Sequence, residues 1–249
     1  MSSALSRRPS TASGIVPTRR SPVVVTGAAG NLGSRLVPWL LAAGREVRSV
    51  DLVPTPGGFV DDLSESGDRG AWMSGARAVV HLAGEPDTTA PWSTVEASNV
   101  HTTRHVLEAA RLHGVERLVL ASSVWAMRKR WNSGGLVEEG DAQPGDRAYG
   151  RSKAQAEALA AQGAGSGLSV VVLRIGGRVT GDDRPRHLDE WEDSCWLGWQ
   201  DFLDGVDCAL DAPLTGVATV NLVSNNPALR NQAGRSGLNP PLSRRLRVM

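Results

Sequence analysis

The hydrophobic positions along this 249-residue chain follow two alternating spacings. Short continuous apolar runs, typical of strands buried on both faces of a parallel sheet, alternate with longer segments whose apolar residues recur every three or four positions, as on an amphipathic helix. Strands are expected at residues 23–25, 46–51, 78–84, 117–123, 168–175 and 217–223. Helices are expected at 31–43, at 94–113 and from Tyr149 onward. The alternation predicts an α/β fold built on a parallel sheet.

A glycine-rich turn joins the first expected strand to the first expected helix. Gly27, Gly30 and Gly33 are spaced as G-x-x-G-x-x-G, which suits a tight turn, a close approach of backbone N–H groups to a pyrophosphate, and close packing of helix on strand. Three glycines alone also fit an ordinary connection, but the strand before them, the helix after them and an acid about twenty residues on favour a cofactor site. We therefore expect a Rossmann-type doubly wound sheet that binds a dinucleotide.

The acid is Asp51, at the end of the second expected strand. A carboxylate there can accept hydrogen bonds from the hydroxyls of an adenosine ribose, so it favours NAD over NADP as the cofactor. His81 lies inside a hydrophobic strand and is expected to be a core residue rather than a catalyst.

Hydroxyl and amine groups are placed to complete a reaction centre. Ser122 and Ser123 end the expected strand 117–123, at the sheet edge where ligands bind. Tyr149 and Lys153 are four residues apart, so they share one face of a helix and the ammonium can lie near the phenol. Free tyrosine titrates near 10, and a base that works near neutrality needs a pKa about three pH units lower, roughly 4 kcal/mol of extra stabilisation of the phenolate. The lysine and a positively charged nicotinamide can contribute it.

Composition narrows the class of partner. Lys and Arg number 27 against 26 Asp and Glu, a net charge of +1, which gives no electrostatic case for a nucleic acid or a membrane surface. The expected partner is a small molecule, with a homo-oligomer left open. Cys195 and Cys208 form no C-x-x-C pair, so neither a metal site nor a disulfide framework is expected. These two cysteines favour a reducing, cytoplasmic location. No apolar run approaches the roughly 18 residues of a membrane span.

Four segments are expected along the chain. Residues 1–20, rich in Ser, Arg, Thr and Pro, predict a flexible tail, with an organellar transit segment as the alternative. Residues 21–180 form the dinucleotide-binding domain, 181–235 a small C-terminal substrate-binding segment with the last strand, and 236–249 a polar tail.

These motifs resemble those of the extended short-chain dehydrogenase/reductase superfamily, the NAD-dependent epimerases and dehydratases. The resemblance lies in 26–33, Asp51, Asp62-Leu63, 81–84, Asn99, Ser122-Ser123 and 149–153. Within the superfamily, Arg174-Ile175-Gly176, Arg186-His187-Leu188 and Asp201-Phe202 are similar to the uronate dehydrogenase-like group.

The resemblance implies a role for each matching residue. Tyr149 is the acid/base, Lys153 lowers its pKa and holds the nicotinamide ribose, and Ser123 orients the reacting oxygen. Cofactor contacts are implied for Gly27, Gly30, Asn31, Leu32, Gly33, Asp51, Asp62, Leu63, Leu82, Ala83, Gly84, Asn99, Tyr149, Lys153 and Ile175. Substrate contacts are implied for Ser122, Ser123 and Arg186, the arginine facing a substrate carboxylate. A solvated arginine in a loop is the alternative for Arg186.

The chain also departs from the uronate dehydrogenase pattern. Where that group carries Asn-His after the serine pair, this chain has Val124-Trp125, and Gly177 stands where the group has a serine. The basic run 128–131 has no counterpart in the pattern. Sugar hydroxyls would lose hydrogen-bond partners at these positions. The resemblance therefore supports the cofactor and its chemistry more strongly than it supports a uronate as the substrate.

Together these features predict an NAD-dependent dehydrogenase that transfers a hydride between a sugar or sugar-acid hydroxyl, uronate-like, and the nicotinamide. Two alternatives stay open. One is a nucleotide-sugar epimerase or dehydratase that uses the cofactor without net consumption. The other is a non-catalytic NAD-sensing regulator on the same fold.

Overall fold

The computed structural model describes residues 21–129, 142–177 and 181–224. The tails expected at 1–20 and 236–249 lie outside the described residues, as do 225–235 and the second half of the basic run 128–131. Within the described part of the chain, no helix has the length and apolar character needed to cross a bilayer.

One seven-stranded parallel sheet organises the molecule. Its strands are β1 (Val23–Thr26), β2 (Val47–Asp51), β3 (Phe59–Val60), β4 (Ala78–His81), β5 (Arg117–Ser123), β6 (Ser169–Ile175) and β7 (Val217–Leu222). They lie in the order β3-β2-β1-β4-β5-β6-β7, and every neighbouring pair is parallel. The order reverses between β1 and β4, where the carboxyl ends of the strands open a crevice for ligands. The Rossmann-type doubly wound fold predicted from the sequence is therefore confirmed.

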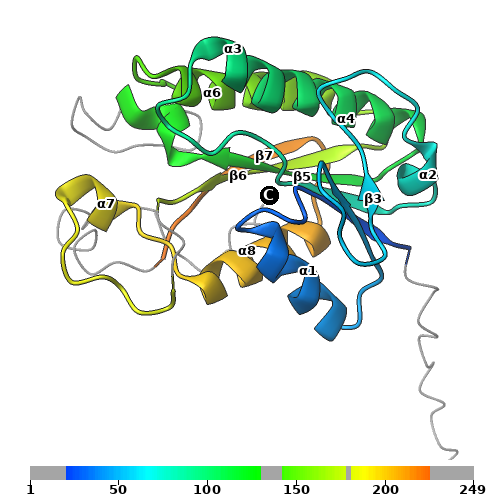
Figure 1. Ribbon diagram of the computed structural model, residues 1–249, viewed down its shortest axis with the longest axis horizontal. Coiled ribbons are helices and arrows are strands. Elements are labelled where there is room, and N and C mark those ends of the chain that lie inside the picture. The colour runs from blue at the N-terminus through cyan, green and yellow to red at the C-terminus, as the bar shows by residue number, and fades with distance from the viewer. Residues whose placement is uncertain (1–20, 130–141, 178–180, 225–249) are drawn as a thin grey trace, which may run out of the picture.

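Helices cover both faces of the sheet (Figure 1). α1 (Gly33–Ala42) and α8 (Trp199–Asp211) pack on one face. The other face is covered by α4 (Thr102–Leu112) and α6 (Ala148–Gly163), with the short α2 (Gly70–Met73) at its margin. α8 and β7 join the same core as the rest of the sheet. Among the described helices, α7 (Glu190–Ser194) lies to one side of the two layers, beside the carboxyl ends of the strands.

The helix expected at 94–113 is interrupted. A four-residue α3 (Trp92–Val95) runs into a π-helical turn, η1 (Glu96–His101), before α4 begins. Two hydroxyl groups bond to carbonyls inside this turn: Thr102 Oγ1 donates to Ser98 O at 2.6 Å and Thr103 Oγ1 to Asn99 O at 2.7 Å. Side chains that bond to the preceding backbone bend a helix, and π-turns occur often at functional sites. Apolar spacing alone does not reveal such a turn.

A buried ion pair links the sheet to α6. Arg174 of β6 binds Glu157 of α6 through two bonds, Nε to Oε1 at 2.9 Å and Nη2 to Oε2 at 2.8 Å. Ser122 of β5 donates to the same carboxylate at 2.5 Å. All three side chains are buried, so removing one charge would leave the other without compensation in a region of low dielectric.

We predict that Arg174→Leu lowers the free energy of unfolding by about 3–5 kcal/mol, because it leaves the Glu157 carboxylate buried and unpaired. Urea unfolding followed by circular dichroism measures the loss. The matched control is the double variant Glu157→Leu/Arg174→Leu, which removes both charges and should recover most of the stability. A single variant as stable as the parent chain would contradict the assignment.

Candidate active site

The glycine turn is fixed by two close approaches. Gly27 has a φ of +71°, and a Cβ on it would lie 2.6 Å from the backbone N of Ala83, just beyond β4. A Cβ on Gly33 would lie 2.1 Å from the carbonyl oxygen of Gly27. Any larger side chain at either position would therefore push the turn away from the end of β4 or from the start of α1.

The start of α1 leaves backbone donors available. The N–H groups of Asn31, Leu32 and Gly33 have no hydrogen-bond acceptor among the described residues. They face the crevice end of a ten-residue helix, where N–H groups and the positive end of the helix dipole favour an anion such as a phosphate. The turn thus has the shape and the donors that a pyrophosphate requires.

Asp51 closes the site on the β2 side. Its carboxylate accepts the N–H of Ala29 at 2.9 Å and the N–H of Val53 at 3.3 Å. These bonds hold the carboxylate beside the glycine turn, and each oxygen keeps a further lone pair for a ligand hydroxyl. The sequence placed Asp51 next to the turn, and the structure agrees.

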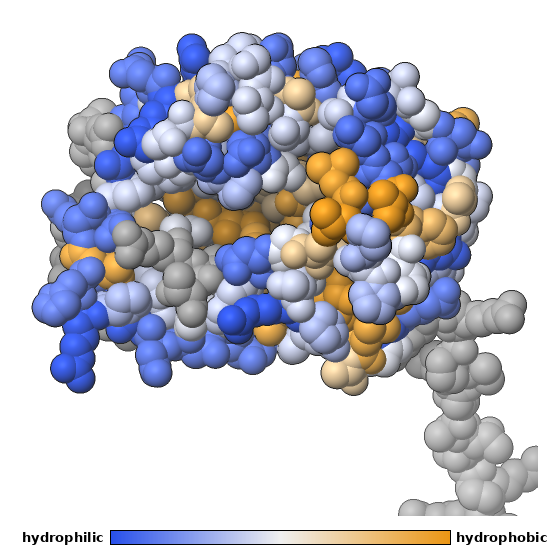
Figure 2. All heavy atoms as spheres, viewed as in Figure 1, coloured by the Kyte–Doolittle hydropathy of each residue, from blue (hydrophilic) through white to orange (hydrophobic). Residues whose placement is uncertain are grey.

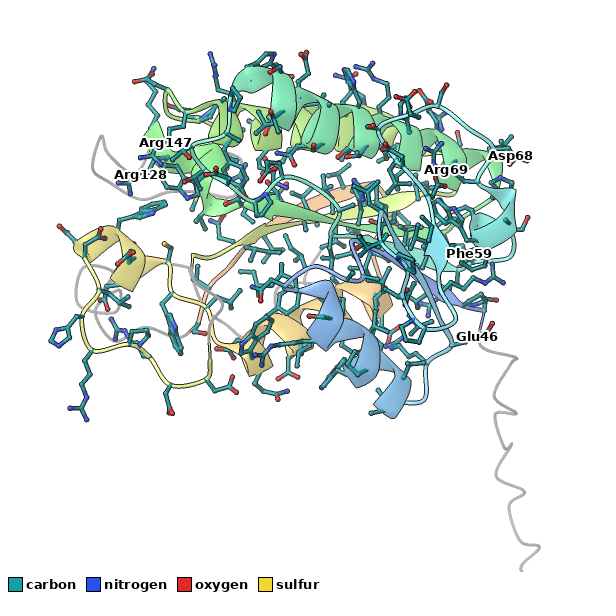
Figure 3. All side chains as sticks on the ribbon, viewed as in Figure 1. Glu46, Phe59, Asp68, Arg69, Arg128 and Arg147 are labelled. Carbon is teal, nitrogen blue, oxygen red and sulfur yellow. The ribbon has the colours of Figure 1, made fainter. Side chains whose placement is uncertain are left out.

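The loop that carries Asp62 and Leu63 is held by hydrogen bonds from one buried arginine. The buried Arg69, labelled in Figure 3, donates to three carbonyls of this loop, among them Glu65 O at 2.5 Å and Gly67 O at 2.9 Å. The Asp62 carboxylate accepts the hydroxyl and the N–H of Ser64, which lowers its pKa. Leu63 is buried in the core. The loop is therefore held beside the end of β2, as its predicted role in holding an adenine requires.

Asn99 fastens the end of β4 to α6. Its Oδ1 accepts the N–H of Glu85 at 2.9 Å, and its Nδ2 donates to Ser152 Oγ at 2.9 Å. A Cβ on Gly84 would lie only 2.4 Å from that Oδ1. Both ends of the Asn99 amide thus hold protein groups and position the Leu82–Gly84 segment. A direct contact of Asn99 with a cofactor stays a prediction.

Ser123, Tyr149 and Lys153 come together at the carboxyl end of β5, as their spacing predicted. Tyr149 and Lys153 are both buried on α6, and Lys153 Nζ lies 5.7 Å from the centre of the Tyr149 ring. The same ammonium donates to Ala121 O at 3.2 Å. The Ser123 side chain hydrogen-bonds to the Tyr149 hydroxyl. The three groups form one polar cluster at the carboxyl end of β5.

Burial acts on the two ionisable groups of this cluster in opposite directions. It raises the pKa of Tyr149, an effect that the Ser123 hydrogen bond partly offsets and the charge of Glu85 reinforces. It lowers the pKa of Lys153 to about 8, with the Glu157 carboxylate one turn away pulling the value up. Desolvation favours the neutral form of each group. In the protein without its cofactor the pKa of Tyr149 therefore lies above its ordinary value, and the lowering expected from Lys153 together with a bound nicotinamide stays a prediction.

His81 is a core residue, as expected. It is fully buried, its Nδ1 lies 2.7 Å from Thr26 Oγ1, and burial lowers its pKa to about 3. The ring is therefore neutral at physiological pH and bonds the ends of β1 and β4 together. Among the described residues, no cluster of histidine, cysteine or acidic groups is arranged to hold a metal ion.

Ser122, Ile175 and Arg186, the other predicted site residues, lie in three different environments. The Ser122 hydroxyl donates to the buried Glu157 carboxylate, so its proton is engaged in the ion-pair cluster and its contact with a substrate stays a prediction. Ile175 is buried opposite Ser123 in the parallel register, at the cofactor side of the sheet edge. Arg186 is exposed, and no contact brings it to Tyr149 within the part of the chain that the structure describes.

An aromatic and cationic wall, made of Trp125, Trp191, Arg128 and Arg147, lies beside this cluster. Trp125 lies in the 3-10 turn η2 (Val124–Met127), which begins directly after Ser123. Its ring contacts the ring of Trp191 of α7 edge-on, with 6.1 Å between the ring centres. The guanidinium groups of Arg128 and Arg147 lie over the Trp125 ring at 5.5 and 4.9 Å. Figure 3 shows the two labelled arginines together, above α7. Trp125 and Arg128 stand out in the sequence as departures from the family pattern, but their contact with Arg147 joins segments far apart in the chain and leaves no sequence signal.

The chain is similar to known proteins of one family. The sequence model of the NAD dependent epimerase/dehydratase family matches residues 23–188. The chain is 32% identical to an L-arabinose 1-dehydrogenase (NAD(P)(+)) of Haloferax volcanii, over 82% of this chain and 88% of that protein. It is 30% identical to an NAD-dependent glucose-6-phosphate dehydrogenase of the same organism, over 77% of this chain and 80% of the other.

Among solved structures, a variant uronate dehydrogenase from Agrobacterium tumefaciens, complexed with NAD, superposes with a TM-score of 0.69 at 28% identity. That match covers 84% of this chain and 78% of the other. The resemblance to the extended short-chain dehydrogenases, and within them to uronate dehydrogenase-like proteins, is thereby confirmed.

The buried phenol can be titrated directly, because Tyr149 is the only tyrosine in the chain. Near-ultraviolet absorbance of the phenolate should show a pKa above the ordinary value of about 10 in the cofactor-free folded protein, and a value near 10 after unfolding in denaturant. Tyr149→Phe, which lacks the transition, is the control, and circular dichroism at each pH confirms that the protein is folded. A folded-state pKa at or below the unfolded value would contradict the burial argument.

Proposed function

The chain belongs to the NAD-dependent epimerase/dehydratase family, and on that basis we propose that it is an NAD-dependent oxidoreductase acting on a sugar or sugar-acid hydroxyl. The observation that carries the proposal is the cluster of Ser123, Tyr149 and Lys153 beside the glycine turn. A non-catalytic protein on this fold has no need to bury a tyrosine and a lysine together, since burial of each costs free energy.

The proposed cofactor is NAD, and the residues around the turn fit it. The free N–H groups of Asn31 and Leu32 suit the pyrophosphate, and the Asp51 carboxylate suits the ribose hydroxyls while repelling the 2′-phosphate of NADP. When bound, NAD would supply the hydride acceptor and a positively charged ring. Lys153, buried between Ala121 and Tyr149, is placed to hold the ribose next to that ring.

In the proposed reaction, the chain's own residues handle one proton. Ser123 donates a hydrogen bond that orients the reacting oxygen, and Tyr149 takes the proton from the substrate hydroxyl as a hydride leaves the adjoining carbon. Lys153 in its charged form stabilises the phenolate that this requires. Because its pKa is lowered to about 8 in the cofactor-free protein, the ammonium is mostly present at neutral pH and is lost above that value.

The proposed substrate class follows from relatives as well as from the site. The arabinose and glucose-6-phosphate dehydrogenases and the uronate dehydrogenase named above all oxidise sugars or sugar acids by name. A uronate is the specific substrate we propose. The runner-up is a nucleotide-sugar epimerase or dehydratase, and stoichiometric release of NADH during turnover would exclude it, since such enzymes regenerate their cofactor.

We predict that Tyr149→Phe lowers kcat by about 100-fold or more, the usual contribution of a positioned acid/base. NAD binding, measured by calorimetry, should stay within about threefold, because the phenol hydroxyl gives less than 1 kcal/mol to cofactor affinity in this account. Turnover is followed by NADH absorbance with glucuronate, galacturonate, L-arabinose and glucose 6-phosphate. Unchanged turnover in the variant would overturn the role of Tyr149. Tight NAD binding with no oxidation of any sugar would favour a sensing protein.

A further inference from the structure

We propose that Arg128 and Arg147 form an anion-binding subsite that holds the carboxylate or phosphate of the sugar substrate. The inference rests on the proposed function and assigns a substrate class to the same site. The first support is that two guanidinium groups from different segments lie over the same Trp125 ring, one from the end of η2 and one from the N-cap of α6. Arg128 also lies 4.0 Å from the centre of the Trp191 ring.

The positive charge of the two guanidinium groups is the second support. Within the described part of the chain, neither forms an ion pair with a carboxylate, whereas Arg45, Arg174 and Arg184 each do. Asp189 and Asp87 face this region and attract Arg128 and Arg147 respectively, but both lie beyond ion-pair distance. Each arginine also repels the other. Two like charges gathered on one ring favour the arrival of an anion.

Hydrogen-bond donors are available as well. The Nη1 group of Arg128 is buried and bonds to none of the residues described. Arg147 donates one N–H to Thr88 Oγ1 at 3.1 Å, and its other N–H groups bond to none of the described residues. Arginine binds carboxylate and phosphate oxygens through paired, charge-assisted bonds that lysine cannot reproduce.

The subsite adjoins the reacting groups. The N–H of Trp125 donates to Ser123 Oγ at 3.3 Å, and Arg147 precedes Tyr149 by two residues. A Cβ on Gly150 would lie 2.7 Å from the carbonyl oxygen of Trp125, so η2 and the start of α6 are packed backbone to backbone. Figure 2 shows a hollowed strip below the layer that carries α6, and Figure 3, in the same view, places Arg128 and Arg147 at its edge.

These features fit a small anionic sugar. The charged group of such a sugar can meet the two guanidinium groups that lie over the Trp125 ring, while its hydroxyl meets Ser123 and Tyr149. The wall thus replaces, with different chemistry, the amide and imidazole partners that the uronate dehydrogenase pattern has after the serine pair. Arg186, exposed and uncontacted among the described residues, is not needed for this binding mode.

The test compares anionic with neutral sugars. We expect Arg128→Gln and Arg147→Gln each to raise KM for the preferred anionic sugar by about tenfold or more, the usual value of a charged hydrogen bond. Their kcat, and their KM for L-arabinose or glucose, should change by less than about threefold. Glucuronate, galacturonate and glucose 6-phosphate form the anionic arms, which separate a carboxylate from a phosphate ligand. Arg151→Gln is the matched control. Arg151 lies on α6, which Arg147 caps, but its guanidinium lies over the ring of Trp92 of α3 at 5.4 Å and not over Trp125.

Two outcomes would overturn the subsite: equal losses on neutral and anionic sugars, or a rise in KM caused by Arg186→Gln and not by the pair. A binding measurement keeps the test independent of turnover. Glucuronate and glucose 6-phosphate, added to the NAD-saturated protein, should quench tryptophan fluorescence through Trp125 and Trp191, and the double variant Arg128→Gln/Arg147→Gln should lose that response. If the parent chain oxidises no sugar but shows this quenching, the proposed function fails and the subsite stands. If it shows no quenching by either anion, the subsite fails.

Discussion

Burial of a tyrosine and a lysine side by side is the constraint on which this site depends. Both groups lose hydration at the carboxyl end of β5, and each is thereby driven toward its neutral form. The surrounding structure offsets that cost with specific contacts: Ala121 O accepts from the ammonium, Ser123 bonds the phenol, and Glu157 adds a negative charge one turn away. Arg174 in turn holds Glu157 in place.

The fold was largely predictable, because parallel strands, amphipathic helices and a glycine turn leave period-dependent marks in a sequence. The Tyr149–Lys153 pair was also predictable, since spacing of four on a helix sets one shared face. The π-turn at Glu96–His101 was not, because it depends on hydroxyl bonds to carbonyls rather than on apolar spacing. Nor was the direction of the Tyr149 pKa, because desolvation is a property of the packed environment.

The substrate-binding part of the site was even less predictable from the sequence. Trp125 and Arg128 were visible in the sequence only as departures from a family pattern. Their meaning depends on Arg147 and Trp191, which reach the same place from other segments. A family resemblance identifies the parts of a site that sequence neighbours build, whereas contacts between distant segments decide what the pocket accepts.

Burial keeps Tyr149 protonated in the protein without its cofactor, and we propose that the positive charge of bound NAD, with Lys153, lowers the pKa of this phenol. Absorbance of the single phenolate, recorded against pH with and without saturating NAD, tests it most directly. We predict that NAD moves the transition to lower pH and that Lys153→Met reduces this displacement. A transition that NAD leaves unmoved, in a protein shown by calorimetry to be saturated, would contradict it.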